Sequence, residues 1–582
     1  MKSARLLASI LLLVLVAATA CDCNDATGAD ADTRIDNLAS MLPATSEGVL
    51  VVPELADLPD NLDYALRRVE QFQPEARNNE QAINRMLGFR ITDVESWDAA
   101  GFDPDGSLLF SMFGTRPVLA AHVDDTNAFE TNVVGTLRRQ LETEDPIEEQ
   151  QFGERSFRIS GQGLANDMAW FYDDSMVVLI LPPLEAFEVF DTGTATSVAN
   201  KLGDLQRDVS LAESQSFADF RSGIGSDFPV SLYLHSDYYL DNTDVDDQHL
   251  GFGGVDTLAD SLMEWSNSNA DNIGLGFRAG DQSIEVQGFV GGDDEVIAQA
   301  RDAYATEQDV QWDGLLTENT TFAARTSIDL SKSIETFLQN LPDSERRTIE
   351  RELSQMGRNH DMDIMEDVIG AFSGHSLLVF YGVGPGISGA AGEFMQRDIP
   401  GGVNTFLNNS GLLYSIHFAD ADKKDQLLDY MTAFGGDQLQ RNALEYDGEP
   451  VDDIEVLQLA NIDEYPIRMF NDRNAVTLAT AGLGESSVYE YLTERRDEPL
   501  LSEAENSPLG TQFATAERTN GLYLNFGNLQ SSVRELGAPI SGYANVLSPL
   551  HELLMTAGVD DDGFRMSTEL AFSDPLEDDD EQ

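Results

Sequence analysis

Two histidines are the residues of this chain best placed to do chemistry. His122 and His417 each end an apolar segment, and acidic residues follow both of them. A histidine beside a carboxylate can act as a general base or bind a metal ion. The alternative is a structural role, in which the ring bonds to backbone at the end of a strand. We favour that role, because the sequence contains no H-E-x-x-H motif and no other closely spaced histidine pair.

A group of carboxylates offers the other candidate site. Asp241, Asp244, Asp246 and Asp247 lie close together in an expected loop, and Ca²⁺ takes about 6–8 oxygen ligands in a compact cage. The segment lacks the D-x-[DN]-x-[DN]-G pattern and its distal glutamate. In a chain with 103 Asp and Glu residues, such clusters also arise by chance. We predict no cofactor and keep Ca²⁺ at these four residues as the alternative.

Two further segments approach a catalytic or nucleotide-binding motif without matching it. Gly370 to Gly374 contains Ser373 but has the wrong spacing for the G-x-S-x-G nucleophile turn of hydrolases. The glycine-rich run from Gly382 to Gly392 contains Pro385, which lacks an amide proton, and no lysine follows as it does in a phosphate-binding loop. The missing motifs favour a non-catalytic role.

The charge of the chain excludes one class of partner. Lys and Arg total 35 against 103 Asp and Glu, so the formal net charge is −68. Such a chain repels nucleic acid and anionic membrane faces. The acidic residues are spread along the sequence, which indicates an adaptation of the whole surface. Because salt shortens the Debye length to about 3 Å at 1 M, we expect a protein adapted to saline surroundings.

The N-terminus predicts export and lipid anchoring. Residues 1–20 have a basic start, an apolar run and small residues, as a secretory signal does. Ala18-Thr19-Ala20-Cys21 resembles a bacterial lipobox, in which Cys21 carries the lipid; plain cleavage after Ala20 is the alternative. The other cysteine, Cys23, has no evident partner. The sequence thus predicts a protein attached to the membrane of the cell envelope by an N-terminal lipid.

Short sequence echoes predict an internal duplication. Ser107-Leu108-Leu109 recurs as Ser376-Leu377-Leu378, His122 recurs as His417, and Leu232-Tyr233-Leu234 recurs as Leu522-Tyr523-Leu524; two more echoes, at 164–166 with 459–461 and 276–278 with 563–565, keep the same order. Strands in hairpins with interspersed helices indicate an α+β fold. We predict two tandem duplicated lobes, each a mainly antiparallel sheet with packed helices.

The expected boundaries follow from this pattern. An acidic flexible tether spans 21–39, the first lobe 40–291, a connection 292–314, the second lobe 315–572 and a disordered acidic tail 573–582. An insertion at 382–410 distinguishes the second lobe from the first. It is expected to be an apolar loop that packs on its own sheet or contacts a ligand or partner, through Phe394, Met395, Ile399, Val403, Phe406 and Leu407.

One segment resembles a known group of proteins. Leu42-Pro43-Ala44-Thr45-Ser46 precedes an expected strand, Gly48 to Val52, and Pro53. This resembles uncharacterised bacterial envelope lipoproteins, with a domain of unknown function that begins with an L-P-A-[DT]-[TS] segment and continues into a strand and helix. The resemblance covers about thirty residues and brings no catalytic residues with it. It implies an envelope protein without an assigned activity.

Three functions remain compatible with the sequence. The first is a lipid-anchored envelope protein with a non-catalytic structural or binding role, whose partner is another envelope protein. The second is a carrier of an apolar ligand held between sheet and helices, with the insertion as a lid. The third is an extracytoplasmic hydrolase that uses two carboxylates about 5–9.5 Å apart.

Overall fold

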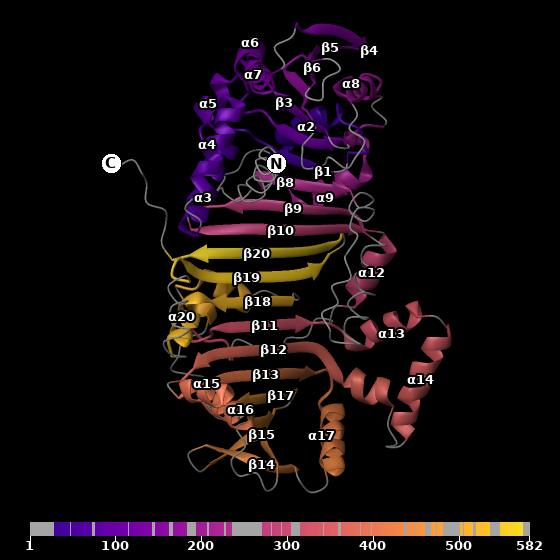
Figure 1. Cartoon of the computed structure of the whole chain (residues 1–582). Coiled ribbons are helices and arrows are strands. Elements are labelled where there is room, and N and C mark those ends of the chain that lie inside the picture. The colour runs from indigo at the N-terminus through magenta and orange to yellow at the C-terminus, as the bar shows by residue number, and fades with distance from the viewer. Residues whose placement is uncertain are drawn as a thin grey trace. The chain divides into compact units, whose positions relative to one another are not determined.

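The computed structural model describes residues 28–573, with gaps at 47, 73–75, 114–115, 143–145, 162–166, 183–193, 206–208, 226–227, 236–269, 281, 293, 304–314, 342, 359–362, 385, 397–398, 436–438, 447–448, 460–466, 473, 481–500, 505, 516–519, 536–546 and 561. The chain divides into two compact units between Val296 and Ile297, and the segment Asp560–Ser567 belongs to the first unit (Figure 1). The division falls within the predicted connection 292–314, whereas residues 560–567, which we placed in the second lobe, belong to the first unit; the predicted lobes 40–291 and 315–572 stay a prediction.

The first unit is built on one antiparallel sheet. Its strands pair in the order β10-β9-β8-β1-β2-β3-β7-β6-β5-β4. Their bounds are β1 Gly48–Val52, β2 Leu108–Phe113, β3 Arg116–His122, β4 Glu148–Phe152, β5 Arg155–Ser160, β6 Met168–Asp173, β7 Met176–Ile180, β8 Val230–His235, β9 Ala270–Ala279 and β10 Ser283–Gly292.

Helices cover both faces of the first unit's sheet. One face packs against α3 and α5 and against the continuous run of α6, the π-helical turn η1 and α7; the other packs against α2, α8 and α9. The helices are α2 Gly28–Ala39, α3 Asp57–Phe72, α4 Ala76–Leu87, α5 Val94–Ala99, α6 Thr126–Phe129, η1 Glu130–Val134, α7 Gly135–Gln140, α8 Ala195–Gly203, the 3₁₀ turn η4 Leu211–Glu213, α9 Gln215–Ile224 and, across the unit boundary, α12 Asp294–Asp302.

An aromatic cluster closes the α3 side of this sheet. The rings of Phe89 and Trp97 lie 4.8 Å apart between centroids, Trp97 and Phe102 4.9 Å, and Phe102 and Phe129 5.2 Å, all at steep angles. Edge-to-face pairs of this kind add about 0.5–1.5 kcal/mol each beyond the area that they bury. Leu62 and Leu66 of α3 join the same core. Helices of the first unit therefore pack onto this face, although sheet residues on it such as Leu50, Phe110 and Leu232 stay half-buried.

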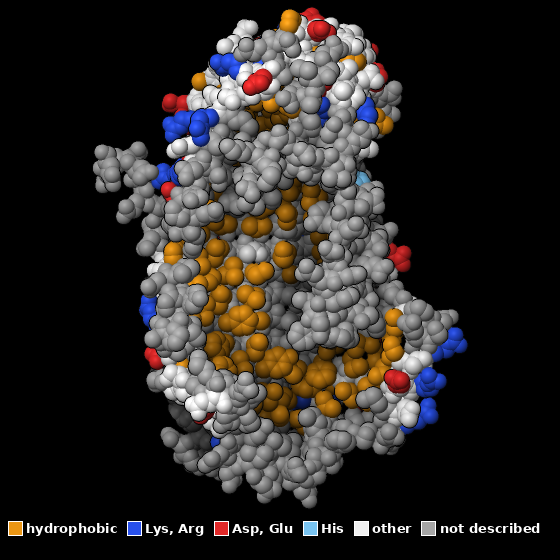
Figure 2. Space-filling view, viewed as in Figure 1, with side chains coloured by type: hydrophobic (Ala, Val, Ile, Leu, Met, Phe, Trp, Pro, Cys, Tyr) orange, Lys and Arg blue, Asp and Glu red, His pale blue; other side chains and the backbone are white. Residues whose placement is uncertain are grey.

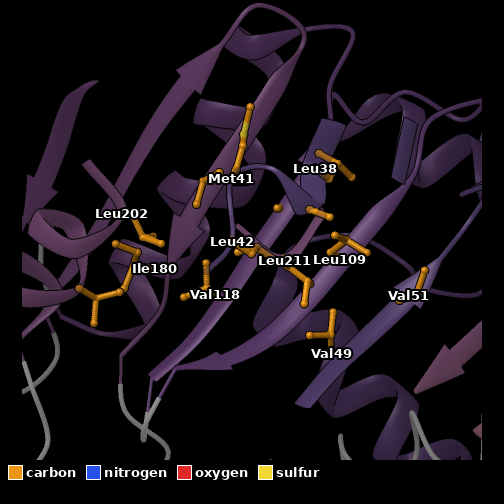
Figure 3. Packing of buried hydrophobic residues seen from close by; sticks show 14 of the residues in the cluster. Leu38, Met41, Leu42, Val49, Val51, Leu109, Val118, Ile180, Leu202 and Leu211 are labelled. Atoms are coloured by element: carbon orange, nitrogen blue, oxygen red, sulfur yellow. The ribbon is translucent and has the colours of Figure 1, made fainter. Parts of the chain in front are cut away.

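The predicted tether is wrong over its second half. Residues Gly28–Ala39 form α2, and its Ile35, Leu38 and Ala39 are buried in the core on the other face of the sheet; Figure 3 shows Leu38 beside Leu109 and Val49. The acidic residues lie on the outer side of the helix, where Asp32 and Asp36 pair with Arg221 of α9. Apolar residues three and four positions apart form the buried side of α2. We missed this spacing because acidic residues stand between the apolar ones in the sequence.

The second unit contains a sheet with a matching order of strands. They pair as β19-β18-β11-β12-β13-β17-β16-β15-β14, all antiparallel, and β19 also pairs with β20. The bounds are β11 Phe322–Ser327, β12 Phe372–Val383, β13 Ser410–Phe418, β14 Leu439–Tyr446, β15 Glu449–Leu459, β16 Ile467–Asn471, β17 Ala475–Thr480, β18 Asn520–Asn525, β19 Leu550–Val559 and β20 Phe564–Phe572.

Each strand of the first order has a counterpart at the same place in the second. The predicted α+β class with antiparallel sheets is confirmed, while common descent of the two units by duplication stays a prediction. The register corrects one of the sequence echoes. The residue after His122, Val123, pairs with Phe102, and the residue after His417, Phe418, pairs with Phe372. His122 and His417 therefore occupy matching positions in the two sheets.

On that alignment His375, rather than Ser376, takes the place of Ser107. The amide of His122 bonds to the carbonyl oxygen of Ser107, which sets these two residues side by side. In the second unit Ser376 pairs with Ile416, one residue before His417. The neighbour of His417 is therefore His375, one residue before Ser376.

The helices of the second unit bury one face of its sheet more completely than the other. A large core that includes Leu377, Val379 and Tyr523 lies with α19 and η8, whereas the opposite face has a small cluster around Phe418, Leu428 and Val476. The helices are α13 Leu330–Asn340, α14 Asp343–Arg358, the π turn η6 Ile364–Val368, the 3₁₀ turn η7 Ile369–Ala371, α15 Ile387–Met395, α16 Ile399–Asn408, α17 Ala421–Gly435, the 3₁₀ turn η8 Leu501–Glu503, α19 Pro508–Thr515 and α20 Phe526–Glu535.

The insertion is a pair of helices rather than the expected loop. Its two ends meet where the amide of Gly384 bonds to the carbonyl oxygen of Asn409 at 2.6 Å, and α15 and α16 are joined by a 2.7 Å bond from Thr405 Oγ1 to Glu393 Oε2. Ile387 and Ala390 are buried. Glycine and proline in the segment suggested a loop, but the apolar residues between them supply a helical face that packs locally.

Candidate functional site

The strand β12 shows how the second unit's sheet divides into a buried and a less buried face. Its side chains alternate, as they must in a strand: Leu377, Val379 and Tyr381 are buried in the large core, whereas Leu378 and Phe380 on the other side are only half-buried. Both sides carry large apolar residues. Among the described residues, only the side with Leu377, Val379 and Tyr381 belongs to a large core.

Strand pairing extends this half-buried surface across the sheet. Phe322 of β11 lies opposite Phe380 and also opposite Leu524 of β18, and Leu412 of β13 lies opposite Phe380 on its other side. All of these side chains are half-buried. We call this surface the open face; its centre is formed by Phe322, Leu378, Phe380, Leu412, Leu522 and Leu524.

The open face continues to both sides of this centre. Towards β16, Tyr414 lies opposite Leu478, which lies opposite Met469; towards β19, Met555 lies opposite Leu522. Tyr414 keeps 37% of its surface exposed. From β19 to β16 the face is about 29 Å across, at roughly 4.8 Å between neighbouring strands. It is long and narrow, because each strand contributes only one or two of these apolar side chains to it.

Figure 2 shows hydrophobic side chains gathered over β11, β12 and β13 of the second unit, with charged side chains towards α13 and α14. Apolar surface left in water costs about 25 cal/mol per Å². Contiguous apolar patches on soluble proteins are for this reason small, unless they serve a binding site. None of the side chains that define the open face is charged, so it offers burial rather than acid–base chemistry.

A pair of hydroxyl groups lies on one long edge of the open face, where the middle strands β11 and β12 leave it. Thr326 Oγ1 and Ser376 Oγ are 2.7 Å apart at the surface, and Ser376 is on the same side of β12 as Leu378. Each hydroxyl can both donate and accept, so the pair keeps hydrogen-bonding capacity for a third group. The open face thus has an apolar body and a polar edge.

The predicted insertion residues lie on α15 and α16, and α16 contacts β13 (Figure 1). Phe394, Met395 and Ile399 fall within these two helices. Val403 of α16 is 43% exposed, whereas Phe406 and Leu407 are half-buried. The insertion therefore stands beside the strand that carries Leu412 and Tyr414.

His122 has the structural role that we favoured. Its Nδ1 accepts a 3.2 Å hydrogen bond from the backbone amide of Ser107, and the ring is buried. Burial lowers the pKa of His122 from its usual value. The imidazole is therefore neutral at pH 7 and ties two strands together.

His417 belongs to a polar group on the buried side of the second unit. Its Nδ1 lies 3.2 Å from Ser373 Oγ, which donates to the carbonyl oxygen of His417 at 2.9 Å, and Ser327 Oγ lies 2.6 Å from Nδ1 of His375. Burial, and then the neighbouring His375, lower the pKa of His417 to about 4. Ser373 uses its proton to hold the backbone, so this group joins the ends of strands rather than forming a nucleophile.

The carboxylate candidates divide into two cases. Asp241, Asp244, Asp246 and Asp247 lie outside the described residues. At the turn between β19 and β20, Asp560 accepts from the amides of Asp562 and Gly563, and Arg565 pairs with both acids. Arg565 thus compensates part of the charge of the two carboxylates at this turn. In the described part of the chain, no group of three or more His, Cys, Asp or Glu residues could hold a metal ion.

Sequence reasoning missed the open face although it named several of its residues. Leu378, Leu522 and Leu524 lie in the echoed segments, which we used only as evidence for a duplication. A strand with apolar residues at every position indicates burial on both sides. The sequence pattern holds no signal that one side lacks its cover.

Comparison with known proteins adds no function. No family model matches the chain, and no curated protein matches it. Among solved structures it is similar to TP0453 in crystal form III, with 10% identity and a TM-score of 0.23 over 46% of this chain and 88% of that one. Crystal form I of the same protein gives 10% identity and a TM-score of 0.22, over 47% and 88%. Similarity this weak supports no argument about fold or activity.

Among the described residues, no helix combines the length and apolar character needed to cross a membrane.

Proposed function

We propose that this chain is a lipid-anchored cell-envelope protein with a non-catalytic binding role, and that it carries an apolar ligand on the open face of its second unit. The observation that supports the proposal is the row of half-buried Leu, Phe and Met side chains from β19 to β16. Binding sites for small molecules are mostly apolar with few polar groups, as this face is.

The lipid anchor supports the same role. Cys21 follows an apolar run and a small-residue segment that resembles a lipobox. An acylated cysteine would hold the protein at a membrane, since each buried methylene contributes about 0.8 kcal/mol. A carrier held at a membrane meets apolar ligands where they are concentrated. The anchor test is Cys21→Ser, which should abolish detergent partitioning and change the intact mass; unchanged partitioning would remove the anchor from the proposal.

The binding test uses an uncharged fluorescent naphthylamine, because an anionic dye would be repelled by a net charge of −68. We expect the Cys21→Ser chain to bind the dye, and Leu378→Gln and Tyr414→Asn to weaken binding at least tenfold. Val209→Ser is the matched control, because Val209 is an apolar residue of the first unit with 54% exposure. Equal binding by all four proteins would contradict the proposal.

Deletion of the helical insertion tests whether the ligand binds to the open face or to the insertion. Replacement of residues 383–409 by a short glycine-containing turn removes α15 and α16 and keeps the strand residues. If the dye still binds with similar affinity, the sheet is the site; if binding is lost while the melting midpoint is unchanged, the helices form the site.

A further inference from the structure

We propose that the ligand of the open face is a membrane lipid with acyl chains and a head group that carries no net negative charge. This inference rests on the proposed function and names the class of ligand. It is drawn from the dimensions of the face, from the chemistry of its polar edge and from the charge of the chain.

The dimensions fit acyl chains. The hydrocarbon core of a bilayer is about 30 Å thick, so the chains of one leaflet extend about 15 Å. The open face is about 29 Å across at the usual strand spacing, which accommodates such a chain lying across several strands. Its side chains are aliphatic or aromatic and non-ionic, as at Leu378, Leu412 and Leu524. A chain of methylenes needs no hydrogen-bond partner, and the centre of the face offers none.

The polar edge fits a head group. Thr326 and Ser376 present two hydroxyls at the surface beside Leu378, and Tyr414 presents a third polar group at a partly exposed position. Hydroxyls bond esters, alcohols and amines without supplying charge. An amphiphile with its polar end near Thr326 and Ser376 would pass over Leu378 and extend its chains across β13 and β17 to β16, about 14 Å at the usual strand spacing.

The charge of the chain decides between head groups. With 103 acidic against 35 basic residues, the potential around the protein is strongly negative. A phosphatidylglycerol head group or a fatty-acid carboxylate would be repelled at low salt, whereas a zwitterionic phosphatidylethanolamine would not. The repulsion should weaken in 1 M salt, where the Debye length is about 3 Å.

The experiment measures extraction of lipid from vesicles by the Cys21→Ser chain. The probes are phosphatidylethanolamine and phosphatidylglycerol, each with a pyrene-labelled acyl chain, in phosphatidylcholine vesicles. Removal of a labelled lipid to the protein converts excimer fluorescence into monomer fluorescence. At low salt we expect at least tenfold more extraction of the phosphatidylethanolamine, and a smaller ratio in 1 M KCl.

Variants test where the acyl chains and the head group of the lipid bind. Leu378→Gln should reduce extraction at least tenfold, and Tyr414→Asn supplies a second variant at a more exposed position in case the first does not fold. Thr326→Ala with Ser376→Ala should reduce extraction several-fold, because the two hydroxyls that bond the head group are removed. Val209→Ser should behave as the parent chain does.

The outcomes are distinguishable. If the dye binds at the open face and neither lipid is extracted, the lipid inference is wrong and the proposed function stands. If neither dye nor lipid binds, both are wrong. Equal extraction of the two lipids at low salt overturns the charge argument. If sedimentation shows a dimer that Leu378→Gln converts to a monomer, with no extraction by either form, the face is occupied by a second copy and the inference is overturned.

Discussion

The two units share an order of strands and differ in what covers one face of the sheet. In the first unit, α3, α5 and the run from α6 to α7 pack onto that face around Trp97, Phe102 and Phe129. In the second, α13 and α14 contact the short helices η7 and η6, and only a small cluster forms beneath α17. Among the described residues, the two sheets thus differ in the size of the helix-covered core on this face, which is large in the first unit and small in the second; the side chains at matching positions of the sheets, such as Phe110 and Leu378, are half-buried in both.

The largest expected effect on stability tests whether helices pack less closely onto the sheet of the second unit than onto that of the first. Leu62 of α3 is buried under the first unit's helices, and Ile334 of α13 is a half-buried aliphatic residue on the corresponding helix. Leu62→Ala should destabilise the first unit by about 2–5 kcal/mol, because it leaves a cavity in a packed core. Ile334→Ala should cost the second unit roughly 1 kcal/mol, because less contact is lost.

Hydrogen exchange during urea titration reports the two units separately and is the measurement for this pair. A cost for Ile334→Ala as large as that for Leu62→Ala would mean that α13 packs as α3 does. The open face would then be a closed core in solution.

A smaller effect on stability is expected at one buried polar position that the two sheets share, on β9 in the first unit and on β19 in the second. Glu552 is buried and accepts hydrogen bonds from the hydroxyl of Tyr523 at 2.7 Å, from Ser507 and from the amide of Leu509 at the start of α19. At the matching position of the first unit stands Asn272, also buried, and no described residue bonds to its side-chain amide.

Glu552→Gln should destabilise the second unit by about 1–3 kcal/mol, because an amide group cannot accept from the Leu509 amide with its nitrogen. Asn272→Leu should leave the first unit unchanged or raise its stability by up to about 1 kcal/mol, because it removes a buried polar group without a partner. Thermal melting of the two variants measures both. A strong loss of stability in Asn272→Leu would show that Asn272 is hydrogen-bonded in solution.

The smallest expected effect is a dependence on pH. The folded-state pKa of His417 is about 4, below the ordinary 6.5, because of burial and then His375. The unfolded chain therefore binds the proton more readily than the folded one does. The stability that the neutral ring contributes is complete above about pH 6.5 and is lost as the pH falls towards 4.

Since the ring of His417 is partly exposed, we expect solvent screening to limit this loss to about 1–2 kcal/mol. His417→Gln should flatten the stability difference between pH 7 and pH 4.5 relative to the parent chain, which also carries many titrating carboxylates. His122→Gln is the matched variant in the first unit, where burial lowers the pKa in the same direction. An unchanged pH dependence in His417→Gln would show that this histidine titrates normally.

Local sequence patterns determined much of the secondary structure. The alternation and turn residues predicted β1 at Gly48–Val52 and β5 at Arg155–Ser160 with their observed bounds. The hairpin between β6 and β7 turns one residue later than the Asp173-Asp174 that we expected: Asp173 pairs with Met176, so the turn residues are Asp174 and Ser175, with Asp174 at a φ of 49°. These features depend on backbone preferences that a few neighbouring residues fix. The helix α2 was missed because its acidic residues concealed a regular apolar face.

The candidate site depended on contacts that no local pattern records. The sequence by itself determined that Leu378 and Phe380 are strand residues with apolar neighbours on both sides. Whether helices cover those side chains depends on where α13 and α14 pack, and this is set by the sum of many distant contacts. Alternation along a strand shows which residues share a face. Only the tertiary structure decides whether that face is buried by the chain itself or remains a surface for something else.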